Sequence, residues 1–210
     1  MGADRKALES KGLFSQRETR MYKELEIEIR GLTPTIQHSG QLADPLNQWT
    51  KAMREITKKR VKTDADLMEL SRLEWMGGLY VDDKGRPCWP GENIEALIRS
   101  GAKATKSGKD AQSGLIVDGN PQLIFPDMKK SPEQLWENPE YRFVSGVRVG
   151  QSRVMRTRPI FRNWSLKFVV SYNPSIIKSE SDLLAWIDHA GAAVGLSDFR
   201  PKFGRFERVT

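Results

Sequence analysis

The sequence predicts a single α+β domain, and three observations lead to this fold class. The chain of 210 residues is 38% hydrophobic and 29% charged, which is typical of a globular protein with a buried core. Apolar and charged residues alternate in "MYKELEIEIRG" with the two-residue period of a strand. "SESDLLAWIDHAGAAV" instead has the spacing of an amphipathic helix.

We expect residues 1–20 to form a flexible N-terminal arm and residues 21–210 to form one domain. Periodicity, caps and stop residues predict the elements of that domain. In chain order they are a strand (22–30), two helices (47–60 and 63–78), a hairpin (78–89), a helix (91–106), a flexible loop (107–114), two short strand-like runs (114–126), a helical turn (131–136), two strands (141–149 and 165–172), a helix (179–194) and a strand (203–209).

The longer elements follow the order β-α-β-β-α-β once residues 38–88 are set aside. We interpret residues 38–88, which hold the helical pair and its hairpin, as an insertion between the first strand and the first helix. With the strand at 141–149 as the second of the sheet, this order is that of a ferredoxin-like fold, the architecture of RNA-recognition (RRM-type) domains. One face of such a sheet is covered by both helices and the other is free for a ligand. Residues 150–164 would form an extended link, longer than a hairpin turn.

Positive charge is concentrated in a few segments of the chain. The formal net charge is +7 and the pI is about 9.5, which favours anionic partners. Acidic residues are instead concentrated at 64–95 and 180–188, whereas a merely solvated surface interleaves its charges. The basic groups are Lys58, Lys59, Arg60 and Lys62; Lys103, Lys106 and Lys109; Arg148, Arg153, Arg156, Arg158 and Arg162; and Arg200, Lys202, Arg205 and Arg208.

The stretch "GQSRVMRTRPIFRNW" carries arginines and aromatic residues without an acid. Several phosphate contacts of this kind give salt-dependent binding to nucleic acid, and guanidinium groups also stack on unpaired bases. We expect its arginines, with Arg148, to clamp a nucleic-acid backbone, and Lys103, Lys106 and Lys109 to form a second track. The group Lys58 to Lys62 would contact the strand or a neighbouring subunit. The rings of Phe161, Trp164, Phe203 and Phe206 are better explained as core.

Enzyme chemistry is weakly represented in the sequence. "GAKATKSGKD" lacks the spacing of a phosphate-binding loop, and no GxSxG or HExxH motif is present. His38 could act as a general base on an RNA 2′-hydroxyl, although a locally hydrogen-bonded loop histidine is the simpler interpretation. Cys88 is the only cysteine and the chain has two histidines, so a Cys/His zinc site lacks ligands. We therefore expect no disulfide, metal or other cofactor.

No apolar run approaches the roughly 20 residues of a membrane helix, and the N-terminal residues lack the apolar core of a signal peptide. We therefore expect a cytoplasmic protein with no membrane partner.

Two segments, "PGENIEALIRSGAK" and "GLSDFRPKFGRFE", resemble the RAMP proteins of CRISPR systems. In that superfamily a Pro-Gly turn opens the first helix and a late glycine/aromatic segment closes the domain. The resemblance implies a backbone-type subunit that polymerises along a guide RNA, with residues 38–88 in the position of its thumb or finger. The stretch at 150–164 is also similar to one in uncharacterised bacteriophage proteins, which implies a stand-alone phage relative in the cytoplasm of a bacterial host.

Processing endoribonucleases of the same superfamily use an early histidine and a glycine-rich late loop. The resemblance would make His38, Gly195 and Gly204 the counterparts, but the late loop here has fewer glycines than theirs.

Three hypotheses follow from the sequence. The first is a non-catalytic protein that binds single-stranded RNA or DNA, with RNA preferred, as a homo-oligomer or as a subunit of a ribonucleoprotein. The second is a metal-independent endoribonuclease that uses His38. The third is a phage assembly protein whose arginines meet an acidic protein surface.

Overall fold

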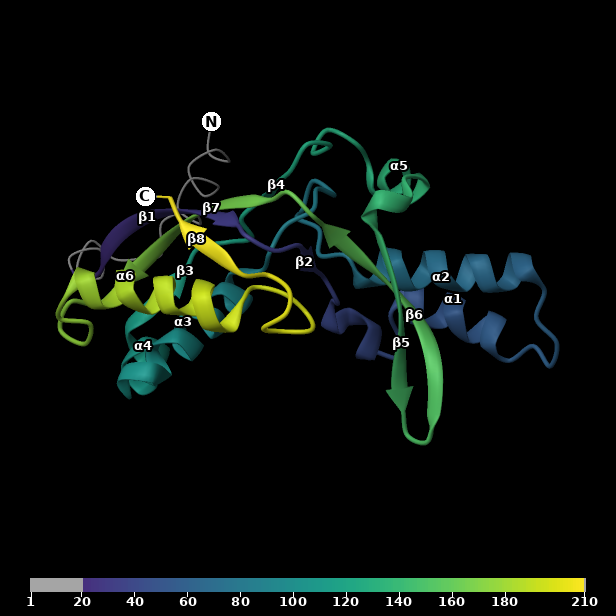
Figure 1. The fold of residues 1–210 in the computed structure, drawn as a ribbon, viewed down its shortest axis with the longest axis horizontal. Helices are drawn as coiled ribbons and strands as arrows, with labels where there is room; N and C mark the ends of the chain where they lie inside the picture. The colour runs from purple at the N-terminus through teal and green to yellow at the C-terminus, as the bar shows by residue number, and fades with distance from the viewer. Residues whose placement is uncertain (1–20, 210) are drawn as a thin grey trace, which may run out of the picture.

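The computed structural model describes residues 21–209 as two antiparallel sheets and six α-helices, which confirms the α+β class. The arm expected over residues 1–20 lies outside the described residues. In Figure 1 the larger sheet and its helices lie at one end of the molecule, and the smaller sheet lies at the other end with the helical pair of the expected insertion.

The larger sheet has the order β3–β7–β1–β8, and β4 also pairs with β7. Its pairings are all antiparallel, and the register of the long central pair sets Ile27 opposite Phe168. Both side chains are buried, because every second residue of each strand faces the core. The strands are β1 (Lys23–Gly31), β3 (Leu115–Val117), β4 (Leu123–Ile124), β7 (Ser165–Tyr172) and β8 (Phe206–Arg208).

Helices cover one face of this sheet (Figure 1). α3 (Gly91–Ala102) and α6 (Glu180–His189) pack against each other so closely that a Cβ on Gly101 would overlap the carbonyl oxygen of Trp186. α6 continues into a π-helical turn, η5 (Ala190–Val194), so the helix predicted over 179–194 is confirmed in its extent.

The other face of the sheet carries acidic side chains. Glu24 and Glu26 of β1 are exposed on it, and Glu28 beside them pairs with Lys167 at 2.9 Å. Carboxylates repel phosphates, so the sheet face that the RRM-type prediction leaves for a ligand is poorly suited to nucleic acid.

The strand predicted at 141–149 forms, but its place in the larger sheet was wrong. It is β5 (Arg142–Val149), and it pairs along its whole length with β6 (Ser152–Phe161) in a separate sheet. The position beside β7 belongs to β3, which has only three residues. A short run contains too little periodicity to reveal its pairing partner.

Residues 150–164 do not form the extended link that the sequence predicted. Most of them are β6, joined to β5 by a tight turn at Gly150, whose φ of +59° suits glycine. The smaller sheet has the order β2–β6–β5, where β2 is Thr35–Ile36. The predicted loop at 107–114 was also wrong, because Gly108–Gly114 forms helix α4.

The expected insertion contains a 3-10 turn (η2, Gly40–Ala43) and two helices. These are α1 (Gln48–Thr57) and α2 (Asp64–Gly78), and α2 packs against β6. Thr63 caps α2 as predicted, in a capping box with Asp66. The remaining elements are η3 (Lys103–Thr105), α5 (Pro132–Glu137) and η4 (Pro139–Tyr141). Among residues 21–209, no helix has the length and apolar character needed to span a membrane.

Candidate nucleic-acid interface

The hairpin β5–β6 carries most of the predicted arginines. Its register sets Arg148 opposite Arg153 near the turn, and Arg158 opposite Phe143 further along. Arg148 and Arg153 are exposed, and neither forms an ion pair with a residue in the part of the chain that the structure describes. The tip of the hairpin, which projects from the molecule in Figure 1, is therefore cationic.

A cleft of about 620 Å³ lies between this hairpin, the loop after β2, the helices α1 and α2, and the loop after η5. Its lining brings together three of the predicted residues from β5 and β6, Arg148, Arg156 and Arg158, with His38. It also includes Glu74, Asp198 and Phe199, to which the sequence analysis gave no role. We take this cleft as the candidate site.

Glu74 fixes Arg156 in the cleft wall. The Glu74 side chain is only 9% exposed, and its Oε1 contacts Arg156 Nη1. Its Oε2 accepts a hydrogen bond of 3.1 Å from the backbone N–H of Thr157. Arg156 itself is 41% exposed. A buried carboxylate therefore holds an arginine that still reaches solvent.

Arg158 is the most enclosed of the three arginines, with 12% of its side chain exposed. Its Nε lies 2.9 Å from Asp198 Oδ2 as an ion pair, without the angle of a hydrogen bond. Its guanidinium carbon lies 4.8 Å from the centre of the Phe199 ring, within cation–π range. Nη1 is buried and forms no hydrogen bond within residues 21–209. Arg158 is thus held in the cleft wall by Asp198 and by the Phe199 ring.

His38 lies at the rim of the same cleft. Partial removal from water lowers the pKa of its imidazole, and the nearby charge of Arg158 lowers the pKa further. The imidazole is therefore neutral at neutral pH, which is the protonation state that a general base requires.

Lys103, Lys106 and Lys109 do come together, as the sequence predicted. With Arg99 they line a hollow of about 410 Å³ over α3, η3 and α4, and the lining contains no acidic residue. This hollow is lined by none of the residues of the cleft, so the two basic surfaces are distinct.

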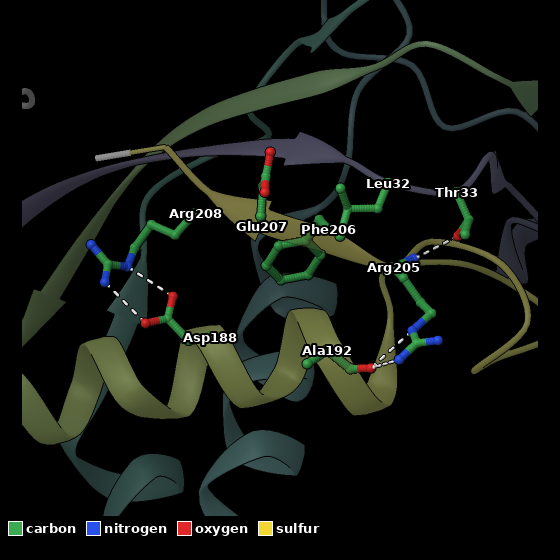
Figure 2. Close-up of a pocket in the computed structure, with 8 residues that line it drawn as sticks. All are labelled: Leu32, Thr33, Asp188, Ala192, Arg205, Phe206, Glu207 and Arg208. Carbon is green, nitrogen blue, oxygen red and sulfur yellow. Dashed lines mark hydrogen bonds and ion pairs between the residues drawn. The ribbon is translucent and has the colours of Figure 1, made fainter.

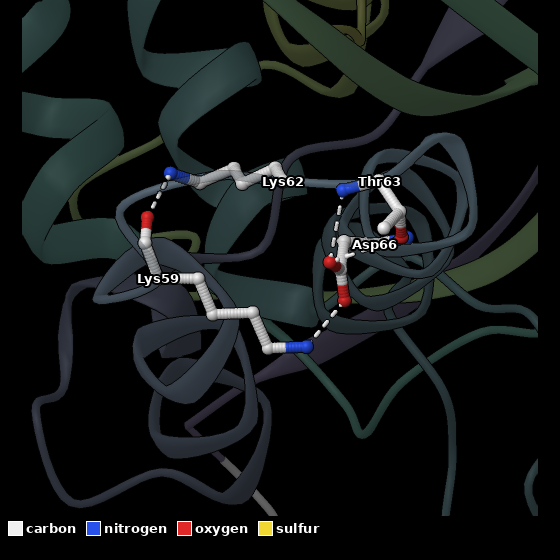
Figure 3. A network of polar contacts seen from close by, with 4 residues as sticks. All are labelled: Lys59, Lys62, Thr63 and Asp66. Carbon is white, nitrogen blue, oxygen red and sulfur yellow. Dashed lines mark hydrogen bonds and ion pairs between the residues drawn. The ribbon is translucent and has the colours of Figure 1, made fainter.

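The group Lys58, Lys59, Arg60 and Lys62 is largely engaged within the protein. Figure 3 shows Lys59 paired with Asp66. It also shows Lys62 Nζ, which donates a hydrogen bond of 3.0 Å to the carbonyl oxygen of Lys59. The bond from Lys59 lowers the pKa of Asp66 to about 2. Lys58 pairs with Glu55 at 2.8 Å. These contacts close the connection between α1 and α2, and leave Arg60 and Lys62 as the members without an ion pair to any described residue.

Two of the C-terminal arginines, Arg205 and Arg208, also have internal partners. In Figure 2, Arg208 donates two hydrogen bonds, of 3.0 and 2.9 Å, to the carboxylate of Asp188. Arg205 Nε donates a hydrogen bond of 2.8 Å to the carbonyl oxygen of Ala192. Both contacts fix β8 to α6 and η5 around a pocket of about 460 Å³. Arg162 likewise lies outside the cleft, where it contacts the carbonyl oxygen of Glu140.

The predicted core role of the aromatic residues is confirmed for Phe161, Trp164 and Phe206, which are at most 3% exposed. Phe203 instead joins Phe143 and Phe199 in an edge-to-face cluster beside the cleft. Sequence reasoning missed this cluster, although "DFRPKF" already interleaves two rings with cations.

Among residues 21–209, no group of three histidine, cysteine or carboxylate side chains is arranged to hold a metal ion.

The sequence matches no known protein family and no curated protein. Among solved structures, it is similar to a chain of the cryo-EM structure described as the Type III-B Cmr-beta bound to cognate target RNA. The TM-score is 0.47 at 13% identity, and the match covers 100% of this chain and 66% of that chain. The resemblance to bacteriophage proteins gains no support from these comparisons.

Proposed function

We propose that the protein binds single-stranded nucleic acid, RNA in preference to DNA, with the β5–β6 hairpin and the cleft beside it. The observation that carries the proposal is the convergence of Arg148, Arg156 and Arg158 on one cleft that also exposes an aromatic ring. Cations suit backbone phosphates, and rings suit unpaired bases. The acidic face of the larger sheet is poorly suited to a polyanion, and the lysine hollow over α3 and α4 contains no aromatic residue, so the cleft is the better site for unpaired bases.

The acids in the cleft orient its arginines without neutralising the surface. Glu74 and Asp198 each contact one arginine, while Arg148 and the neighbouring Arg153 have no described acidic partner. A phosphate that enters meets arginines already held in place, so less side-chain entropy is lost on binding.

Binding of short single-stranded oligonucleotides at several salt concentrations tests the proposal. We expect the affinity to fall steeply with salt, and Arg148→Glu with Arg153→Glu to weaken all sequences alike. These two positions are preferable to Arg156 and Arg158, which also hold the fold through Glu74 and Asp198. Lys129→Glu with Lys178→Glu makes the same charge change at two exposed positions outside the cleft and serves as the matched control.

Salt-insensitive binding, or no binding to any oligonucleotide, contradicts the proposal. The latter result would favour an assembly protein that docks on an acidic protein surface. An absorbance ratio at 260 and 280 nm of protein purified from cells gives a first indication, because bound nucleic acid raises it.

A second candidate function is RNA cleavage, favoured by the neutral His38 in the same cleft. Its imidazole would take the proton of a 2′-hydroxyl, and the 2′-oxygen would attack the adjacent phosphorus while the arginines stabilise the developing charge. The P–O5′ bond would break, which leaves a 2′,3′-cyclic phosphate, and the departing 5′-oxygen would take a proton from water. Incubation of structured RNA with a chelator tests this function. Cleavage that is lost in His38→Ala supports it, and intact RNA with the wild-type protein contradicts it.

We further propose that the larger sheet, α3 and α6 form a ferredoxin-like core of the RAMP type. The strand order β8–β1–β7–β3, with α3 and α6 as the two crossover helices, supports the core. The two motifs behind the RAMP resemblance also have structural roles. Gly91 opens α3 where a Cβ would lie 2.5 Å from the carbonyl oxygen of Val117, and Gly204 has a φ of +78° that suits glycine.

We also propose that the protein works as a homo-oligomer or as a subunit of a ribonucleoprotein. The separation of the acidic sheet face from the basic cleft supports this arrangement, because the acidic face of one copy would be complementary in charge to the cleft of another. Light scattering with and without an oligonucleotide tests it. A monomer that binds one short strand without assembling would contradict it.

A further inference from the structure

Phe199 is a large apolar side chain held at the surface by a costly backbone conformation. Its φ is +55°, a left-handed value that is uncommon for a bulky residue, and 39% of the residue is exposed. Phe161 and Phe206, by comparison, are at most 2% exposed. Unusual backbone conformations of this kind persist where the surroundings enforce them, and they concentrate at ligand sites.

The surroundings of Phe199 hold its ring in a defined orientation. The Phe143 ring, on β5, lies 6.1 Å from it at an interplanar angle of 70°, and Phe143 packs in turn on Phe203 at 5.3 Å. The guanidinium of Arg158 lies over the Phe199 ring, as described above. The ring is thus supported by β5, by β6 and by its own loop, yet it lines the cleft.

From these contacts we propose that Phe199 and Arg158 form a stacking subsite for one unpaired nucleobase. The inference rests on the proposed function and specifies how the cleft recognises its ligand. A ring that lines a cleft offers an apolar surface to a planar base, and aromatic and guanidinium planes are the groups on which unpaired bases stack in proteins. A base within a duplex already has both faces covered, so the subsite selects single strands.

The rest of the cleft suits the remainder of a nucleotide. Arg148 and Arg156 line it beside the subsite and would meet the phosphate. The cavity of about 620 Å³ falls within the range of about 300–1,000 Å³ that is typical of small-ligand sites.

The experiment compares two ten-nucleotide single strands, one with normal bases and one of the same length with abasic sites. We expect the wild-type protein to bind the abasic strand about tenfold more weakly, because stacking of one base contributes about this factor. Phe199→Ala should bind the normal strand about tenfold more weakly than wild type and should bind both strands alike. Phe199→Trp keeps an aromatic ring at this position and should bind the normal strand more tightly than the abasic strand, as wild type does.

The control variant is Met155→Ala, which removes an exposed apolar side chain from β6 outside the cleft and should retain the wild-type preference. Thermal unfolding of each variant verifies that it is folded. A 2-aminopurine in the strand adds a direct readout, because its fluorescence is quenched on stacking with wild type and should not be quenched with Phe199→Ala.

The results separate the inference from the function on which it rests. If wild type and Phe199→Ala bind both strands with equal affinity and the same fluorescence, the subsite is wrong while phosphate-directed binding stands. If the wild-type protein binds neither strand, both the inference and the proposed function fail.

Discussion

Glu74 and Arg156 join helix α2 to strand β6 at the wall of the cleft. The carboxylate contacts the guanidinium through Oε1, while Oε2 accepts a 3.1 Å hydrogen bond from the backbone N–H of Thr157. A single buried side chain on α2 therefore sets both the position of the strand and the orientation of a candidate ligand-binding arginine.

Glu74→Ala is expected to lower stability and raise the affinity for nucleic acid. The buried N–H of Thr157 would lose its acceptor, which costs about 1–3 kcal/mol in the free energy of unfolding, measured with urea. Loss of the carboxylate charge would make the cleft more positive, and we expect this gain to exceed the effect of a less fixed Arg156, so oligonucleotide binding should become tighter.

Glu55→Gln is the matched control for this variant. Glu55 pairs with Lys58 on the exposed surface of α1, and a pair of this kind contributes at most about 1 kcal/mol. A Glu74→Ala protein with wild-type stability and wild-type affinity would show that the contact has neither role.

Arg148→Gln and Arg153→Gln should each lower the salt dependence of binding. Neither arginine has an acidic partner among residues 21–209, so each is available for one phosphate contact. Loss of one contact reduces the slope of log K against log salt by about 1. Arg72→Gln, whose guanidinium is held by both oxygens of Glu69, should leave the slope unchanged. Equal slopes for all variants would exclude the hairpin tip from the interface.

Local signals in the sequence were sufficient for most of the secondary structure. Thr63 and Ser131 cap the helices that they were predicted to start, and the alternation around Ile27 correctly predicts β1. Periodicity does not identify the partner of a strand, however. β5 was therefore assigned to the wrong sheet, and three-residue β3 was left out of it.

The candidate site could be predicted only in its arginines and in His38. Arg156 and Arg158 stand out because no acid is near them in the sequence, yet each contacts one that is distant along the chain, Glu74 and Asp198. Likewise, a run of cations does not reveal that Lys59 is paired with Asp66. Charge clustering indicates where a polyanion could bind, whereas the tertiary fold decides which cations remain available.

Gly101→Ala should destabilise the protein by about 1–3 kcal/mol or more, because α3 would have to move away from α6. The added Cβ would overlap the carbonyl oxygen of Trp186 and would lie 2.9 Å from the Cβ of Ala190. Gly40→Ala places the same group where no atom lies within 4 Å, so its effect should stay within about 0.5 kcal/mol. Urea unfolding of both variants measures the difference. Equal stabilities would show that α3 and α6 are not closely packed.

His38 should make stability depend on pH just below neutrality. Burial and the charge of Arg158 hold its pKa below the ordinary value of 6.5, so the unfolded chain takes up the proton at a higher pH than the folded protein does. Above pH 6.5 the unfolding free energy should therefore be unaffected by His38. As the pH drops below 6.5 toward the lowered pKa of the folded protein, the unfolding free energy should fall. Between about pH 7.5 and about pH 5.5, above the range in which carboxylates titrate, His38→Gln should lose less stability than wild type. Gln112→Asn alters an exposed side chain that does not titrate, and its unfolding free energy should fall with pH as that of wild type does. If the unfolding free energies of His38→Gln and wild type fall in parallel as the pH is lowered, the cleft does not lower the pKa of the imidazole. The proposed use of His38 as a general base then loses its support.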